Sequence, residues 1–191
     1  VQTCALPIYG KPYVRHNVFK GVDKATGRPI VDEGRKPSTG KPVEFCPGLW
    51  GGKDWPPAAY NPNTRMVYIP ANDNHCSILG GLPNPQYKAG SSYTFSANYG
   101  LTIVKDAKYI GEVQAWNVDT GQKAWSAPLP GMTPTWGPLL TTGGGLVFGG
   151  GGTERKFRAY DAKTGKQVWE QVMPSGVTGT PSSFKIGRAH V

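Results

Sequence analysis

A segment of thirteen residues occurs twice in the chain, and the two copies align without gaps 44 residues apart. Residues 113–125 read VQAWNVDTGQKAW, and residues 157–169 read FRAYDAKTGKQVW. The identical positions are Ala115, Thr120, Gly121 and Trp125, which recur as Ala159, Thr164, Gly165 and Trp169. A period of this length is typical of the four-stranded blades of β-propellers. The sequence therefore predicts an all-β fold, a partial β-propeller of about two blades.

The chemistry of the repeat predicts a strand, a tight turn and a second strand. Asn117 and Asp161 can cap the turn with their side chains, and the glycine four residues later supplies the positive φ that the turn requires. Each copy ends in a tryptophan, Trp125 or Trp169, whose large ring we expect to pack one blade against the next.

Apolar runs between glycine-rich turns place the strands of the two blades. In the second blade we expect strands over residues 136–141, 146–149, 157–161 and 167–170. The first blade is expected to begin with strands over residues 58–60 and 66–70, followed by a long insertion over residues 71–111. A third blade is expected to begin at residues 177–184. Residues 19–42 are expected to form an extended connection on the surface.

Both ends of the chain resemble technical sequence. Residues 1–8 (VQTCALPI) back-translate to a common sequencing-library adapter, and residues 186–191 (IGRAHV) back-translate to the reverse complement of the same oligonucleotide. Such segments are excluded before a fold is considered. We therefore expect residues 9–185 to be the biological sequence, truncated on both sides, and Cys4 and His190 to be artefacts.

Composition excludes some classes of protein. The 27 glycines and 18 prolines, with no sustained apolar spacing at the helical period, favour short strands, and no transmembrane segment is evident. The net charge of +9 comes from lysines and arginines scattered through turns, without a run or a single-face stripe. We therefore expect no nucleic-acid partner, while attraction to an acidic protein such as an electron acceptor stays open.

With Cys4 set aside, Cys46 and Cys76 form an even pair. Neither belongs to a C-x-x-C motif or to a His/Cys cluster, so a zinc site fits poorly. A disulfide fits better and would indicate an oxidising compartment, whereas two unrelated buried thiols stay open as the alternative.

Two further segments, together with the repeat, resemble the methanol/ethanol family of PQQ-dependent (quinoprotein) alcohol dehydrogenases. They are residues 51–60 (GGKDWPPAAY) and residues 136–148 (WGPLLTTGGGLVF). The likeness covers essentially all of residues 9–185, in the right order and with compatible spacing. The repeat alone indicates only a quinoprotein-like propeller, whereas the GGKDW and WG segments point to the dehydrogenases.

The resemblance implies a C-terminal-half fragment of a periplasmic, eight-bladed enzyme whose funnel holds pyrroloquinoline quinone beside a calcium or lanthanide ion. In the family, an aspartate takes the proton of a small alcohol, hydride passes to the quinone, and a cytochrome c reoxidises the cofactor. The family's adjacent cysteines, metal ligands and catalytic aspartate lie upstream of Tyr9. This chain is therefore expected to hold no catalytic residue and no metal ligand, and to be inactive by itself.

The residues carried over from the family are few. Asp54-Trp55 stands where the family usually has Asn-Trp against the cofactor, and a carboxylate cannot donate a hydrogen bond unless it is protonated. Asp54 is therefore expected either to repel the carboxylates of the cofactor or to turn away from them. Trp136-Gly137 matches the family's Trp-Gly segment, whose indole reaches into the cofactor site. For these tryptophans, packing between blades is the alternative.

The resemblance also bears on the cysteines, because Cys46 and Cys76 sit where some family members form a disulfide. Two other features are interpreted as structural. Residues 149–152 (GGGG) lack the Gly-Lys-Ser/Thr that completes a phosphate-binding loop, so a turn is expected there. His75, a lone histidine in the insertion, is expected to lie on the surface.

Two alternative functions stay open from the sequence. One is a noncatalytic quinoprotein-like propeller that acts as a scaffold for protein assembly, which would share the repeat but not the cofactor-facing segments. The other is a PQQ-dependent sugar or polyol dehydrogenase on the same propeller, because upstream and insertion loops set substrate choice.

Overall fold

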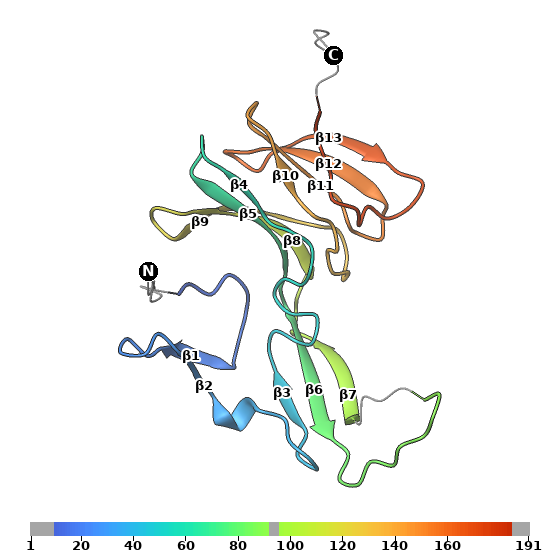
Figure 1. Cartoon of the computed structure of the whole chain (residues 1–191). Coiled ribbons are helices and arrows are strands. Elements are labelled where there is room, and N and C mark those ends of the chain that lie inside the picture. Colours follow the sequence, from blue (N-terminus) through green and yellow to red (C-terminus); the bar gives the residue numbers. More distant parts are fainter. Residues whose placement is uncertain (1–9, 92–95, 185–191) are drawn as a thin grey trace. The chain divides into compact units, whose positions relative to one another are not determined.

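The computed structural model describes residues 10–91 and 96–184 (Figure 1). The described chain forms two compact units. We call the described part of Lys53–Asn72 and Lys108–Val191 the blade unit, and that of Val1–Gly52 and Asp73–Ala107 the insertion unit. Their strands form four antiparallel sheets, and the described residues include no α-helix.

The blade unit contains two four-stranded antiparallel sheets. In each sheet a strand pairs with the strand that follows it in the blade, and in the first sheet the insertion separates the second strand from the third. The strands of the first sheet are β4 (Ala59–Asn61), β5 (Met66–Asn72), β8 (Gly111–Asn117) and β9 (Gln122–Pro128). Those of the second are β10 (Leu140–Thr141), β11 (Leu146–Gly149), β12 (Lys156–Asp161) and β13 (Gln167–Val172). The predicted all-β fold with two blades is confirmed.

The turn that links the last two strands of each blade is built as the repeat predicts. The side chain of Asn117 accepts the backbone N–H groups two and three residues ahead at 2.9 Å each. Asp161 does the same in the second blade, at 3.1 and 2.8 Å. Gly121 and Gly165 follow with φ of 63° and 73°, a region that favours glycine.

The core of the blade unit lies between the two sheets, around Trp125. Its ring centroid is 5.8 Å from that of Tyr68 on β5 and 6.4 Å from that of Tyr160 on β12. Its Nε1 donates a hydrogen bond of 3.1 Å to the carbonyl oxygen of Ala162. The indole of Trp125 therefore packs one blade against the next, as expected, whereas that of Trp169 is 46% exposed. The buried residues of this core are Tyr68, Val113, Ala115, Leu139, Val147, Tyr160 and Ala162.

The insertion unit contains a hairpin of β1 (Phe19–Val22) and β2 (Pro29–Val31), a 3-10 turn (Glu33–Arg35), and a sheet in the order β3-β6-β7. In that sheet β3 spans Val43–Phe45, β6 spans His75–Gly81 and β7 spans Ser96–Ile103. The extended connection expected over residues 19–42 is therefore wrong. Asp23 caps the turn between β1 and β2 by accepting the N–H groups of Ala25 and Thr26, and this allows the two strands to pair.

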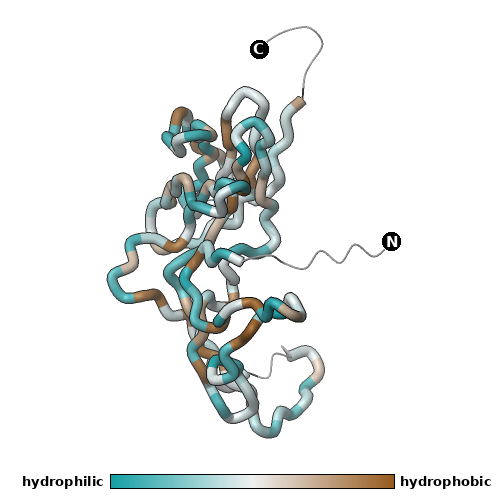
Figure 2. The backbone as a smooth tube through the Cα atoms, turned by 90° about the vertical axis from the view of Figure 1, so that its left-hand side faces the viewer, coloured by the Kyte–Doolittle hydropathy of each residue, from teal (hydrophilic) through white to brown (hydrophobic). Residues whose placement is uncertain are grey.

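Two other strand predictions need correction. Residues 136–139 form no strand, and β10 begins only at Leu140, because the backbone before it lies against residues 150–151, where a Cβ on Gly137 would overlap the carbonyl oxygen of Gly150. Residues 177–184 also form no strand, since no described segment pairs with them. Figure 2 shows short hydrophobic segments alternating with hydrophilic ones along the tube. Within the described residues, no helix has the length and apolar character needed to cross a membrane.

Candidate cofactor site

Asp54 and Trp55 lie on the exposed segment that leads into β4. The carboxylate of Asp54 accepts the backbone N–H of Trp55 at 2.8 Å, and the ammonium of Lys53 donates to the carbonyl oxygen of Asp54 at 2.9 Å. The side chain of Trp55 is 56% exposed. The Asp54 carboxylate is thus held by its own backbone, and the Trp55 ring offers a large aromatic surface.

Trp136 and Gly137 lie where the chain crosses from the first blade to the second. Trp136 is half-buried, and its backbone N–H donates to the carbonyl oxygen of Gly151 at 3.2 Å. A Cβ on Gly137 would overlap the carbonyl oxygen of Gly150, so the two backbones touch at a place that admits only glycine. The glycine run at 149–152 ends β11 and begins the connection to β12, and Gly150 and Gly151 support the segment that carries Trp136.

The two predicted segments lie side by side within the blade unit. The backbone N–H of Leu139 donates to the carbonyl oxygen of Pro57 at 3.1 Å. This contact is two residues beyond Trp55 and three beyond Trp136. Segments that are about 80 residues apart in the chain are therefore joined near both tryptophans.

Two buried polar residues that the sequence did not single out hold the Trp136 segment. Asn72, the last residue of β5, accepts the backbone N–H of Thr135 at 2.7 Å and donates to its carbonyl oxygen at 3.4 Å. Both side chains are 1% exposed. The sequence did contain a signal for Asn72, because it ends an apolar strand. A buried asparagine in such a place needs hydrogen-bond partners.

The two cysteines of the insertion unit are joined. Cys46 and Cys76 form a disulfide whose Cα atoms are 4.3 Å apart, and both are buried, which confirms the expected pairing. The carboxylate of Glu44 lies within 4.8 Å of the two sulfur atoms. Because both sulfur atoms are bonded to each other, this group is not a metal site.

His75 lies next to this disulfide and is 1% exposed, so its expected place on the surface is wrong. Its Nε2 is 3.2 Å from the carbonyl oxygen of Gly51, and its ring centroid is 5.5 Å from that of Trp50. The loop after Cys46, which the disulfide ties to β6, covers the histidine through Trp50 and Gly51.

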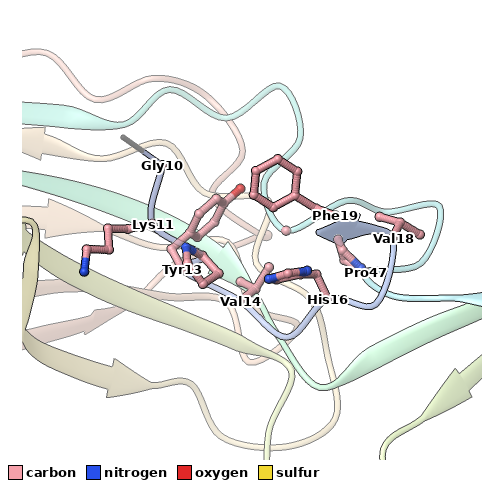
Figure 3. Close-up of a pocket in the computed structure, with 10 residues that line it drawn as sticks. Gly10, Lys11, Tyr13, Val14, His16, Val18, Phe19 and Pro47 are labelled. Atoms are coloured by element: carbon pink, nitrogen blue, oxygen red, sulfur yellow. The ribbon is translucent and has the colours of Figure 1, made fainter. Parts of the chain in front are cut away.

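The insertion unit also contains an apolar cavity of about 310 Å³ (Figure 3). It is lined by residues 10–14 and by side chains that include His16, Phe19 and Pro47. Burial raises the pKa of the Tyr13 phenol at this cavity above its ordinary value. None of the predicted cofactor-binding residues lines it.

Comparison with known proteins decides the family. The family described as "PQQ: Glucose/ethanol/alcohol dehydrogenase, beta-propeller domain" matches residues 30–190 of the chain. The chain belongs to this PQQ dehydrogenase propeller family. Membership accounts for the two four-stranded sheets and for the 44-residue repeat, and it confirms the resemblance found in the sequence.

Several relatives within the PQQ dehydrogenase family are similar over most of the chain. A quinoprotein ethanol dehydrogenase of Pseudomonas putida is 34% identical over 172 residues, which are 86% of this chain and 26% of that protein. A lanthanide-dependent methanol dehydrogenase of Methylacidiphilum fumariolicum (strain SolV) is 33% identical over 180 residues, 93% of this chain and 28% of that protein. The chain thus spans little more than a quarter of the length of these relatives.

Solved structures of PQQ dehydrogenases agree with the fold. A europium-containing methanol dehydrogenase is similar with a TM-score of 0.77 and 31% identity, over 89% of this chain and 29% of that chain. A quinohemoprotein alcohol dehydrogenase from Comamonas testosteroni is similar with a TM-score of 0.75 and 27% identity, over 94% of this chain and 27% of that chain.

The residues present fit part of what a quinone cofactor requires. PQQ is a flat aromatic ring system that carries carboxylates, and indoles such as those of Trp55 and Trp136 have the flat aromatic surface that packs against such a ring. Asp54 fits poorly, because its carboxylate would face the carboxylates of the cofactor and donates no hydrogen bond unless it is protonated. Its bond to the backbone N–H of Trp55 leaves it bound within its own turn.

Proposed function

We propose that residues 9–185 are part of a periplasmic PQQ-dependent dehydrogenase that oxidises primary alcohols to aldehydes and passes electrons to a cytochrome c. In this proposal residues 1–8 and 186–191 are adapter-derived. The metal ion beside the cofactor, calcium or a lanthanide, is held by residues outside this chain.

The observation that carries the proposal is the pairing of the two cofactor-facing segments. The hydrogen bond from Leu139 to Pro57 joins the segment of Trp55 to that of Trp136, inside a fold that belongs to the PQQ dehydrogenase propellers. A noncatalytic scaffold has no need to keep two tryptophans at such a junction while leaving one of them 56% exposed. The alcohol class is supported by relatives named as ethanol and methanol dehydrogenases.

The role proposed for this chain is to bind and orient the cofactor. When bound, PQQ supplies a quinone that accepts hydride from the alcohol. Trp136, at the crossing between the blades, and Trp55, in the segment before β4, would hold the flat ring system against their indoles. Both would exclude water from the ring.

The compartment is supported by the disulfide. Disulfides persist in oxidising compartments such as the bacterial periplasm and are rare in the cytosol. Cys46 and Cys76 form such a bond and are 3% and 5% exposed. A periplasmic enzyme could also deliver electrons to a soluble cytochrome c, and the net charge of +9 favours an acidic partner.

Recovery of the complete gene from the source DNA, by long-read sequencing across both junctions, tests the proposal. We expect an upstream reading frame that encodes adjacent cysteines, carboxylate metal ligands and a catalytic aspartate. The purified gene product, loaded with PQQ and either Ca²⁺ or La³⁺, should then reduce a dye when a primary alcohol is added. A frame without those residues would contradict the dehydrogenase function, and turnover with glucose or glycerol but not ethanol would reassign the substrate to sugars or polyols.

A further inference from the structure

Trp136 lies on a segment with no regular secondary structure, so something other than a strand must fix its position. Residues 133–139 are neither helix nor strand. A side chain that binds a flat ring must be held in one orientation, because freedom lost on binding weakens affinity. The contacts of the residues next to Trp136 show what holds it.

One set of contacts comes from the first blade. Asn72 bonds both backbone polar groups of Thr135, at 2.7 Å to its N–H and 3.4 Å to its carbonyl oxygen. Gly111, the residue opposite Asn72 in the sheet, donates its N–H to the carbonyl oxygen of Thr133 at 3.0 Å. A Cβ on Gly111 would be 2.9 Å from the same oxygen, so the segment lies directly on the strand ends.

A second set comes from the second blade. The hydroxyl of Thr135 donates to the carbonyl oxygen of Gly150 at 3.3 Å and accepts the N–H of Gly137 at 3.4 Å. The N–H of Trp136 itself donates to the carbonyl oxygen of Gly151 at 3.2 Å. Thr135 is thus bound by Asn72 on one side and by Gly150 on the other, and Trp136 is the next residue.

We infer that Asn72 is a positioning residue for Trp136. Its amide is the one side chain, within the described residues, that bonds both the N–H and the carbonyl group of Thr135. Because it is 1% exposed, water does not compete for these bonds. The inference rests on the proposed function, in which the indole of Trp136 binds the cofactor.

A matched control distinguishes positioning from simple stability. Asn61 is also a buried asparagine at the end of a strand of the first blade, 2% exposed. It too bonds the second blade, donating to the hydroxyl of Thr141 at 3.0 Å and to the carbonyl oxygen of Thr142 at 3.2 Å. Its partners lie five residues or more beyond Trp136, so Asn61→Ala removes a comparable buried amide without touching the Trp136 segment.

The experiment is fluorine NMR of the 191-residue chain labelled with 5-fluorotryptophan, with Trp136→Phe to assign one of the six indole resonances. We expect Asn72→Ala to shift or broaden the Trp136 resonance, and Asn61→Ala to leave it in place. Asn72→Asp, which keeps the acceptor for the N–H of Thr135 but removes the amide donor to its carbonyl oxygen, should also shift it and provides the answer if Asn72→Ala does not fold. An unmoved Trp136 resonance in a folded Asn72 variant, or an equal shift in Asn61→Ala, would overturn the inference.

Addition of PQQ to the labelled gene product separates this inference from the proposed function. If PQQ shifts the Trp136 resonance, we expect Asn72→Ala to weaken PQQ affinity roughly tenfold, and Asn61→Ala to leave it unchanged. Equal PQQ affinity in wild type and Asn72→Ala would overturn the inference. A Trp136 resonance that PQQ leaves unmoved would instead contradict the proposed cofactor site, while the effect of Asn72 on the free protein would still be decided by the spectra without PQQ.

Discussion

The indole of Trp125 lies directly against Gly165, so close that a Cβ on this glycine would be 2.5 Å from Cδ2 of the ring. Trp125 belongs to β9 of the first blade, and Gly165 closes the last turn of the second. The glycine that the turn requires for its positive φ is thus also the surface that receives the neighbouring indole. One residue type serves local conformation and inter-blade packing.

This double role predicts that Gly165→Ala is unusually destabilising. An alanine there must adopt a φ near 73° and also displace the Trp125 ring. Gly145→Ala is the matched control, because Gly145 has a φ of 82° but nothing within 4 Å of the added Cβ. We expect Gly145→Ala to cost about 1 kcal/mol of unfolding free energy and Gly165→Ala roughly 1–3 kcal/mol more, measured by urea denaturation. Equal costs would show that the ring moves aside freely.

The two tryptophans that end the repeats are expected to differ in their contribution to stability. Trp125 packs between two tyrosines and donates its Nε1–H to Ala162, whereas Trp169 is 46% exposed and meets Phe157 edge-on at 6.3 Å. We expect Trp125→Ala to lower the unfolding free energy by about 3–5 kcal/mol and Trp169→Ala by less than about 1.5 kcal/mol. Chemical denaturation followed by circular dichroism measures both, and a larger loss from Trp169→Ala would contradict the packing described for the core.

Tyr160 should make the blade unit sensitive to alkali. Burial raises the pKa of its phenol to about 12. The phenol in the unfolded chain, with a pKa of about 10, therefore loses its proton at lower pH than the phenol in the folded protein. The free energy of unfolding consequently falls as the pH rises from about 10 toward the pKa of the folded state. We expect a loss of roughly 2 kcal/mol between pH 10 and 12, which Tyr160→Phe removes. Tyr87→Phe is the control, because Tyr87 is 72% exposed, and its curve should follow that of the wild type.

The disulfide gives a prediction for the insertion unit. Cys46 and Cys76 close a loop of 30 residues. The cross-link lowers the entropy of the unfolded chain, so its removal should lower the free energy of unfolding by roughly 3–4 kcal/mol. The Cys46→Ser/Cys76→Ser double variant should therefore unfold at lower denaturant concentration. Alkylation in denaturant should modify one of the three cysteines before reduction and all three after it. Two or more modified thiols before reduction would show that the bond does not form.

The fold could be predicted from the sequence where local chemistry and repetition agree. The Asx-capped turn, the positive-φ glycine and the closing tryptophan each depend on a few neighbouring residues, so two copies of the pattern were enough to place β8, β9, β12 and β13. The strand predicted over residues 177–184 is wrong because local composition was its only support. A strand exists only with a partner to pair with, and composition alone does not supply one.

The insertion and the candidate site show a second limit. In the sheet β3-β6-β7, strand β3 pairs with residues of β6 that are more than 30 positions later, and no short sequence motif predicts this pairing. Trp55 and Trp136 were found through a family pattern, but Asn72 was not, because its importance comes from bonds to Thr135, 63 residues later. Buried polar partners of this kind depend on the tertiary structure and leave little trace in local sequence.

The seating of Trp125 on Gly165 has a consequence for how such a chain can change in evolution. Each repeat ends in an indole and carries, four residues earlier, a glycine of the kind that receives the indole of the preceding repeat. A duplication or loss of one whole 44-residue unit therefore restores every such junction without any compensating substitution. An insertion or deletion of another length between Trp125 and Gly165 would separate an indole from its glycine, unless it falls in a surface loop. Gene rearrangement can thus alter the number of blades while selection against misfolding preserves the period.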